Sequence, residues 1–201
     1  LYAVLNQVLN STVNIIRVED PVEYALAGVN QVQVNTKAGL TFASSLRSIL
    51  RQDPNVIMVG EIRDKETAEI AMKASQTGHL VLSTLHTNDS ISAVARLIDL
   101  GVPGFMIAAS LSGVMAQRLV RRLCACHEEH GMTSELMERL LTAGVTDPPE
   151  KVGVPVGCEA CDHTGYRGRV GIYELLVFDE AMKMTVASGR QMDEIRSLAR
   201  L

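Results

Sequence analysis

The chain has 201 residues, of which 47% are hydrophobic and 21% are charged, and this balance is typical of a soluble globular protein. It excludes disordered and collagen-like chains. The formal net charge is −4, aromatic residues make up 3% and Trp is absent, so the sequence lacks the basic charge of nucleic-acid-binding proteins and has few side chains that could stack on bases. The length allows one large domain, or one domain with an appendage.

The first residues predict a helix, because apolar side chains recur there at the spacing of one helix face. These side chains are Leu1, Val4, Leu5, Val8 and Leu9. The chain opens on Leu, inside this element, so we expect the sequence to be a fragment. No apolar run reaches the roughly 18–20 residues of a membrane span, and no signal-peptide pattern is present. We therefore expect a soluble, cytoplasmic protein.

Up to about residue 100, short apolar segments alternate with helical patterns. Strands are predicted at residues 13–18, 29–34, 56–59 and 79–84. Helices are predicted to begin at capping residues, namely Thr41, Asp64, and Asn88 or Asp89. Residues 56–59 are all apolar, as in a strand buried on both faces of a parallel sheet, whereas 29–34 alternate, which favours a sheet edge or a hairpin. The order of elements predicts a three-layer α/β domain with a largely parallel sheet.

The pattern changes after residue 100, where a helical stretch rich in Ala, Leu and Met leads into an Arg-rich segment and four cysteines. Further on, helical patterns occupy residues 134–143 and 192–199, with a Pro- and Gly-rich loop at 146–157. We predict three parts: a core at 1–117, a Cys-bearing subdomain with connecting strands at 118–175, and a helical region at 176–201.

Polar side chains follow three of the predicted strands. Glu19 and Glu23 follow the first strand, Glu61 follows the apolar strand at 56–59, and His86 follows the last. The carboxyl ends of parallel strands meet at the edge where α/β sheets bind ligands. In a nucleotide hydrolase, a carboxylate at that edge holds magnesium or polarises the attacking water. One Gly-Glu after a strand also fits an ordinary buried strand, but three polar strand ends in one domain favour a functional site.

Three strings in this order resemble the Asp box, Walker B and His box of the secretion ATPases, the motors of type II secretion and type IV pilus assembly. They are the segments 18–24, 50–64 and 77–88. The resemblance continues through Cys158-Glu-Ala-Cys161 and residues 165–174, so it covers nearly the whole chain. The Cys pairs place the chain nearer to the assembly and secretion branch than to the retraction branch. The resemblance implies a RecA-like P-loop ATPase core, ATP hydrolysis with Mg²⁺, and a hexameric ring.

Carried onto this sequence, the resemblance implies catalytic roles for five residues. Glu23 is the expected general base for the attacking water, with Glu19 as the alternative. Glu61 is expected to serve the magnesium and the water. His79 and His86 are expected to act at the γ-phosphate, although their spacing lets only one of them lie directly at the strand end.

Three arginines are predicted to bind the nucleotide, namely Arg47, Arg51 and Arg63. Arg47 and Arg51 lie one helical turn apart, so they can face one phosphate together. A solvated helix face is the alternative interpretation of this pair.

One part of the family pattern is absent from these residues. In the family, a Gly-rich loop ending in Gly-Lys-Thr or Gly-Lys-Ser precedes the opening helix and holds the β- and γ-phosphates. Here the sequence starts at Leu1-Tyr2, where that loop would end. We therefore expect the isolated fragment to fold, to bind ATP poorly and to be inactive.

The cysteines form two close pairs. Cys158 and Cys161 have the spacing of a zinc-binding pair, whereas Cys124 and Cys126 are one residue too close and are followed by His127. Three arrangements are open. All four cysteines bind zinc, or Cys124 and His127 bind it without Cys126, or the metal is lost and the thiols are free. The resemblance implies that such a zinc is structural.

The sequence thus predicts the C-terminal motor domain of a hexameric secretion or pilus-assembly ATPase. Its expected partners are ATP, identical subunits, and inner-membrane platform proteins that hold it peripherally at the membrane; nucleic acid is not expected. Two other classes are a non-catalytic RecA-like scaffold with a zinc knob, and a DNA translocase, which the acidic charge and the few aromatics disfavour.

Overall fold

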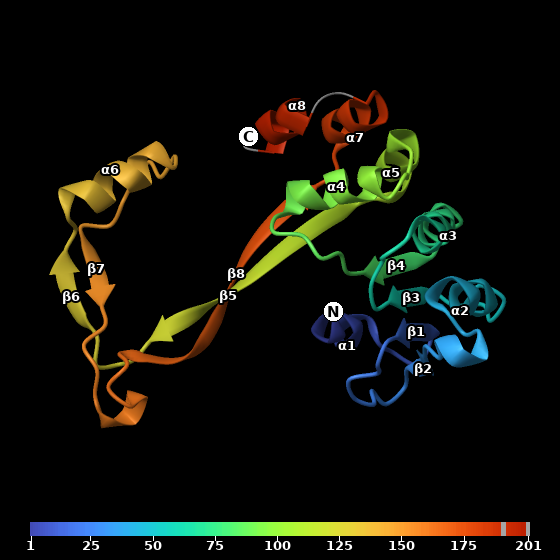
Figure 1. The fold of residues 1–201 in the computed structure, drawn as a ribbon, viewed down its shortest axis with the longest axis horizontal. Helices are drawn as coiled ribbons and strands as arrows, with labels where there is room; N and C mark the ends of the chain where they lie inside the picture. The colour runs from blue at the N-terminus through green and yellow to red at the C-terminus, as the bar shows by residue number, and fades with distance from the viewer. Residues whose placement is uncertain (190–191, 200–201) are drawn as a thin grey trace. The chain divides into compact units, whose positions relative to one another are not determined.

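The computed structural model describes residues 1–189 and 192–199, and the chain divides into two compact units. Unit 1 comprises Leu1–Ala116 and Glu174–Leu201, and unit 2 comprises Gln117–Tyr173. The chain enters unit 2 within strand β5 (Gly113–Leu123) and leaves it within strand β8 (Tyr166–Val177), and these two strands pair with each other (Figure 1).

A four-stranded sheet with the order β2-β1-β3-β4 forms the centre of unit 1, and every pair of neighbouring strands in it is parallel. Its strands are β1 (Ile15–Glu19), β2 (Asn30–Gln33), β3 (Val56–Val59) and β4 (Leu80–Ser83). β1 and β3 are buried throughout, as their nearly continuous apolar sequences predict, and the alternating β2 lies at the edge. The predicted α/β class and parallel sheet are confirmed.

Two apolar clusters cover the faces of this sheet. Ile57 and Val59 of β3 pack toward α2 (Phe42–Ile49) and α3 (Lys65–Gln76). Val56 and Met58 point the other way and cluster with Leu5 of α1 (Tyr2–Val8). This alternation follows from the period of two in a strand. The result is a helix–sheet–helix sandwich.

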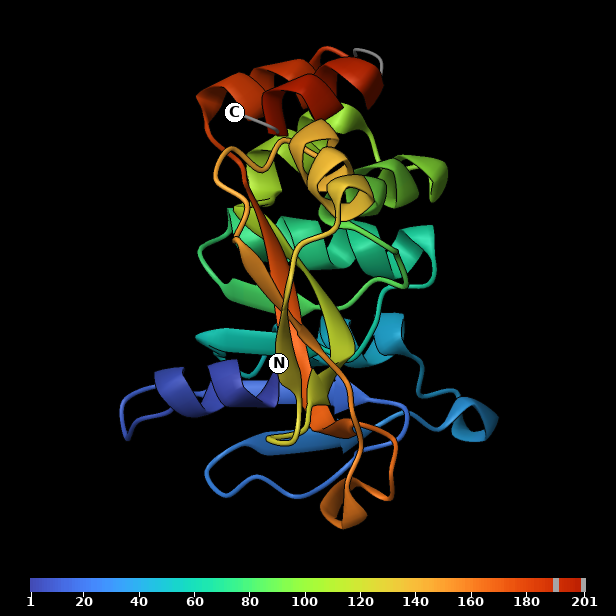
Figure 2. The same ribbon diagram turned by 90° about the vertical axis from the view of Figure 1, so that its left-hand side faces the viewer.

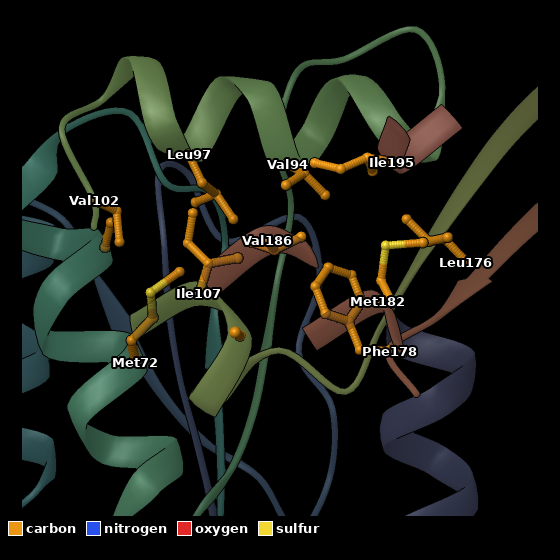
Figure 3. Packing of buried hydrophobic residues seen from close by; sticks show 12 residues of the cluster. Met72, Val94, Leu97, Val102, Ile107, Leu176, Phe178, Met182, Val186 and Ile195 are labelled. Atoms are coloured by element: carbon orange, nitrogen blue, oxygen red, sulfur yellow. The ribbon is translucent and has the colours of Figure 1, made fainter. Parts of the chain in front are cut away.

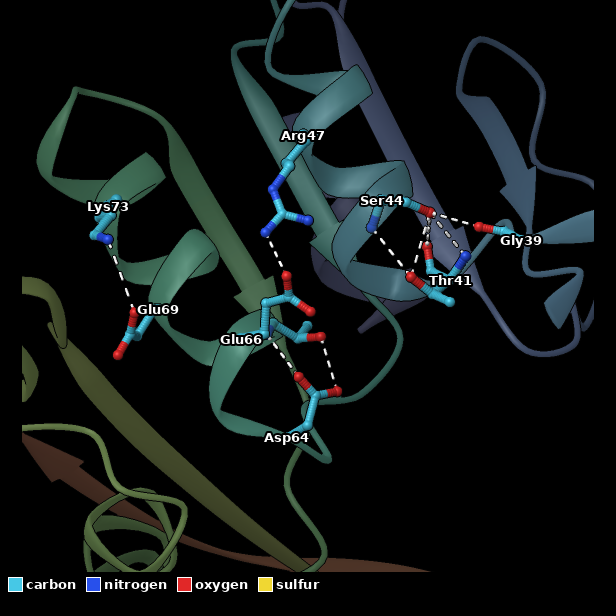
Figure 4. Close-up of polar contacts among 9 residues, drawn as sticks. Gly39, Thr41, Ser44, Arg47, Asp64, Glu66, Glu69 and Lys73 are labelled. Atoms are coloured by element: carbon cyan, nitrogen blue, oxygen red, sulfur yellow. Dashed lines mark hydrogen bonds and ion pairs between the residues drawn. The ribbon is translucent and has the colours of Figure 1, made fainter.

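Local capping explains where the two covering helices begin. Thr41 and Ser44 form a capping box at α2, in which the Ser44 amide donates to the Thr41 hydroxyl at 3.2 Å (Figure 4). Asp64 accepts a hydrogen bond from the Thr67 amide at 2.8 Å at the start of α3. Asp89, rather than Asn88, caps α4 (Ser90–Asp99).

Four helices pack with α3 in a second core beyond the β4 edge of the sheet, as both ribbon views show (Figures 1 and 2). They are α4, α5 (Gly104–Ser110), α7 (Glu180–Ala187) and α8 (Met192–Ala199). Val94, Ile107 and Val186 meet in this core (Figure 3). A Cβ at Gly104 would lie 2.4 Å from the Val186 carbonyl oxygen, so glycine is what allows α5 and α7 to approach closely.

Unit 2 contains a second, shorter pair of strands. β6 (Glu128–Gly131) and β7 (Lys151–Val154) are antiparallel, and α6 (Ser134–Thr142) connects them. The prediction of an unbroken loop at 146–157 is wrong, because backbone pairing with β6 makes residues 151–154 a strand despite their Gly and Pro neighbours. Two short 3-10 helices, at Thr36–Ala38 and Glu159–Cys161, complete the fold. None of the described helices is both long enough and apolar enough to span a membrane.

Candidate active site and cysteine cluster

A pocket of about 270 Å³ lies at the carboxyl ends of β1, β3 and β4 in unit 1. It is lined by Leu1, Tyr2, Glu19, Asp20, Pro21, Glu23, Phe42, Met58, Gly60, Glu61, Thr84 and His86. Four predicted site residues, Glu19, Glu23, Glu61 and His86, therefore line one cavity. The parallel strands explain this, since each of them ends at the same edge of the sheet.

Gly60 allows the carboxyl ends of β1 and β3 to lie close together. Its amide donates to the Val18 carbonyl at 2.8 Å, and a Cβ at this position would lie 3.3 Å from the Glu19 Cα. A side chain there would crowd the end of β1. Glycine at position 60 thus lets Glu61 follow β3 closely beside Glu19.

Glu61 is the most strongly held carboxylate on the β3 side of the pocket. Its side chain is 12% exposed, and its Oε2 lies 2.5 Å from Arg63 Nε and 3.0 Å from His86 Nε2. Burial raises the pKa of the Glu61 carboxyl, but the hydrogen bonds and charges of Arg63 and His86 outweigh burial and hold that pKa below its ordinary value. Glu61 is therefore an anion at neutral pH.

Glu19 is buried against a basic and aromatic cluster. The Tyr2 hydroxyl lies 2.9 and 3.0 Å from its two carboxylate oxygens, and Arg17 Nε lies 3.1 Å from Oε2. The fully buried guanidinium of Arg17 stacks on the Tyr2 ring at 4.2 Å and donates to the Tyr24 carbonyl. Burial, followed by the hydrogen bond to Glu19, raises the pKa of Tyr2. Both Glu19 oxygens are therefore engaged.

Sequence reasoning did not single out Arg17 or Tyr2. A charged residue inside the otherwise apolar segment 15–18 was the available signal, because a buried Arg needs an anionic partner. Arg17 Nε and Nη1 have no hydrogen-bond partner among the described residues. The nearby Glu19 carboxylate, the Tyr24 carbonyl and the Tyr2 ring therefore compensate together for burying this charge.

Glu23 differs from Glu19 in both exposure and contacts. It is exposed, it lines the pocket, and within the described residues its carboxylate makes no hydrogen bond or ion pair. A carboxylate in this state is free to accept a proton from a bound water.

The remaining predicted residues lie elsewhere. His79 precedes β4, at the end of that strand opposite the pocket, and its Nδ1 lies 2.9 Å from the Ala74 carbonyl oxygen. Arg47 pairs with Glu66 on α3 (Figure 4), and Arg51 Nη2 lies 3.4 Å from Ser48 Oγ. None of these three lines the pocket.

Arg63 lies beside two cavities. It pairs with Glu61 of the first and lines a second pocket of about 240 Å³. The first turn of α2, with Thr41, Phe42 and Ala43, forms another part of that second lining. The Arg63 side chain thus lies close to the site and is 62% exposed.

All four cysteines meet in unit 2, where their Sγ atoms lie within 4.8 Å of one another. The separations are 3.9 Å for Cys124 and Cys158, 3.9 Å for Cys126 and Cys161, and 3.8 Å for Cys158 and Cys161. A tetrahedral zinc with Zn–S bonds of about 2.3 Å requires S–S separations of about 3.8 Å. The cluster fits such an ion.

The backbone around Cys161 supports a thiolate. The amides of Cys158 and Gly165 donate to its Sγ at 3.2 and 3.3 Å. The hydrogen bond from the Cys158 amide lowers the pKa of the Cys161 thiol, and burial opposes this effect. With the hydrogen bond from the Gly165 amide added, the pKa of Cys161 falls to about 6. His127 directs Nδ1 to the Cys124 carbonyl at 2.9 Å and lies outside the thiol cluster. Of the three predicted arrangements, the geometry favours the one in which all four cysteines bind the metal.

Comparison with known proteins gives consistent results. A family model described as "Type II/IV secretion system protein" matches residues 1–201. The chain is 55% identical over 189 residues to type II secretion system protein E of Aeromonas hydrophila, covering 94% of this chain and 37% of that protein. It is 49% identical over 205 residues to the type IV pilus assembly ATPase PilB of Myxococcus xanthus, covering 99% of this chain and 36% of that protein.

The fold has a solved counterpart in the pilus retraction motor PilT with bound ADP. The TM-score is 0.67 and the identity 30%, over 98% of this chain and 47% of that one. The chain therefore spans less than half the length of the relatives that it matches.

Proposed function

Because this chain belongs to the type II/IV secretion system protein family, we propose that it is the C-terminal motor part of an ATPase that drives secretion or pilus assembly. The observation that carries the proposal is the pocket at the strand ends, where Glu61, Glu23 and His86 surround one cavity. The names of the relatives support the activity, since they include a pilus assembly ATPase and an ADP-bound motor.

Glu61 serves the metal and the water in this proposal. Carboxylate oxygens are the donors that Mg²⁺ prefers, and an anionic Glu61 meets that requirement without a proton to displace. Mg²⁺ bound with ATP would neutralise phosphate charge as it develops. Arg63 and His86 hold the Glu61 carboxylate in place, and the Arg63 guanidinium adds positive charge beside it.

Glu23 is the proposed general base. As the oxygen of a water attacks the γ-phosphorus, the bond from that phosphorus to the ADP oxygen breaks, and the water's proton passes to the Glu23 carboxylate. Glu19, held by Arg17 and Tyr2, supplies a fixed negative charge instead. For His79, Arg47 and Arg51, the roles toward phosphate stay predictions.

The wider assembly is part of the same proposal. The motor works as a hexameric ring in the cytoplasm and acts on inner-membrane platform proteins, which hold it peripherally at the membrane. Two relatives named for type II secretion and for pilus assembly support this general role. The cysteine cluster binds one structural zinc, which its sulfur separations support.

Replacement of Glu61 by Gln in the full-length protein tests the function. We expect steady-state ATP hydrolysis to fall at least about 100-fold, because the amide removes the charge that serves the metal and the water, while nucleotide binding stays within a few-fold. Glu69→Gln is the matched control, since Glu69 pairs with Lys65 and Lys73 on α3 and lines neither pocket. Turnover of Glu61→Gln close to that of the parent would contradict the assignment. An inactive parent would favour the scaffold.

A further inference from the structure

Unit 2 carries two surfaces of opposite charge. The first, which we call the ribbon, comprises residues 117–123 of β5 and 166–173 of β8, and it contains five arginines and no acidic residue. The second, which we call the tip, comprises residues 127–154 with β6, α6 and β7, and it contains six acidic residues against one Arg and one Lys. A chain of net charge −4 thus concentrates positive charge on one narrow element.

Four of the ribbon arginines have little internal compensation. Arg121 stacks on the Tyr166 ring at 3.9 Å, and Arg122 donates to the Arg167 carbonyl at 3.4 Å. Among the described residues, no carboxylate lies within ion-pair distance of Arg121, Arg122, Arg167 or Arg169. Their charges are available to a partner.

The ribbon also exposes large apolar side chains between its arginines. They are Leu119, Val120, Val170, Ile172 and Tyr173, with exposed fractions from 39% to 62%. Two strands alone cannot cover both of their own faces, so these side chains stay open to solvent. Contiguous exposed apolar groups of this kind mark interaction surfaces.

The tip has the complementary character. α6 is an amphipathic helix in which no residue is buried, and its apolar face exposes Leu141 by 53%. Glu135 and Glu138 belong to the same helix, and neither forms an ion pair within the described part of the chain. The tip therefore presents apolar side chains flanked by unpaired carboxylates.

We propose that the tip of one copy of this protein docks on the ribbon of a second copy. The two surfaces match in both charge and apolar character. An anionic membrane or another polyanion would compensate the ribbon alone and leave the acidic, apolar tip without a partner. Because the tip and the ribbon are different surfaces of one chain, the contact is head-to-tail, and repetition generates a ring or an open filament.

Charge reversal in the full-length protein tests this contact. The tip variant is Glu135→Arg with Glu138→Arg, and the ribbon variant is Arg167→Glu with Arg169→Glu. Each alone places like charges across the interface, so we expect the Kd of self-association to rise at least about tenfold. Asp99→Arg with Glu180→Arg is the matched control, since both residues are exposed in unit 1, and it should associate as the parent does.

Mixing the two variants gives the decisive measurement, made by sedimentation velocity over a salt series. The positive tip of one variant then meets the negative ribbon of the other, so the mixture should associate more tightly than either variant does alone. Circular dichroism of each variant, unchanged from the parent, excludes misfolding as the cause. Unaltered self-association in the single variants, or a mixture that fails to associate, would overturn the proposal. So would a ribbon variant that loses binding only to vesicles of anionic phospholipid.

Discussion

At the scale of single residues, two glutamates four positions apart have opposite environments. Glu19 is buried with both oxygens engaged, and Glu23 is exposed with its carboxylate free. We therefore expect Glu23→Ala to lower kcat by about 10²–10⁴, at least as much as Glu19→Ala does. Steady-state hydrolysis by the full-length variants measures this. A Glu19→Ala enzyme that alone loses all turnover would mean that Glu19 is the base.

We also expect Glu19→Ala and Glu23→Ala to differ in their free energy of unfolding. Glu19→Ala leaves the fully buried Arg17 without its carboxylate, and breaking a buried ion pair in this way costs about 3–5 kcal/mol of unfolding free energy. Glu23→Ala should leave the free energy of unfolding unchanged, because its side chain contacts solvent. Urea unfolding of the two variants should therefore differ even where their activities agree.

Much of the candidate site could be predicted from these residues. Glu19 ends a strand, Glu23, Glu61 and His86 each follow one, and parallel strands bring their ends together. Arg17 and Tyr2 could not be assigned in the same way. Their contacts depend on how α1 packs against β1, which no local pattern encodes.

At the scale of elements, the starts of α2, α3 and α4 were predictable because each has a local cause. Thr41, Asp64 and Asp89 each accept a hydrogen bond from an amide three residues ahead. The ribbon strands had no such signal. Their Arg-rich and Gly-rich residues are exposed on both faces, so neither strand shows the alternation of a half-buried strand.

The cysteine cluster gives a prediction at the same scale. Purified full-length protein should contain about one zinc per chain, and Cys158→Ser should lower both the zinc content and the Tm, because structural zinc contributes folding free energy directly. Elemental analysis and thermal unfolding measure the two effects.

His127→Asn is the control for that experiment. Its ring contacts a backbone carbonyl rather than the thiols, so zinc content should stay near that of the parent. Loss of zinc in His127→Asn with retention in Cys126→Ser would establish the arrangement in which His127 replaces Cys126. Absence of zinc from protein purified without chelator would show that the thiols are free.

At the scale of the whole molecule, the content of residues 1–201 leads to a prediction about ATP. These residues contain no Gly-Lys-Thr or Gly-Lys-Ser. The pocket is lined by acids and His86, with Arg63 beside it on Glu61, and so offers few groups that neutralise phosphate. Isolated residues 1–201 should therefore fold but bind ATP at least about tenfold more weakly than the full-length protein. Titration calorimetry with Mg-ATP measures this. Tight, magnesium-dependent binding to residues 1–201 would refute it.

The course of the chain through β5 and β8 has an architectural consequence. The chain leaves unit 1 and returns to it through two paired strands, and paired strands lie about 4.8 Å apart. A tight turn spans that distance, so a short hairpin loop replacing residues 117–173 would leave the connectivity of unit 1 intact. Unit 2 is in this sense a module grafted onto a hairpin. The cysteine module and the strand-end pocket can therefore be gained, lost or exchanged independently within one fold.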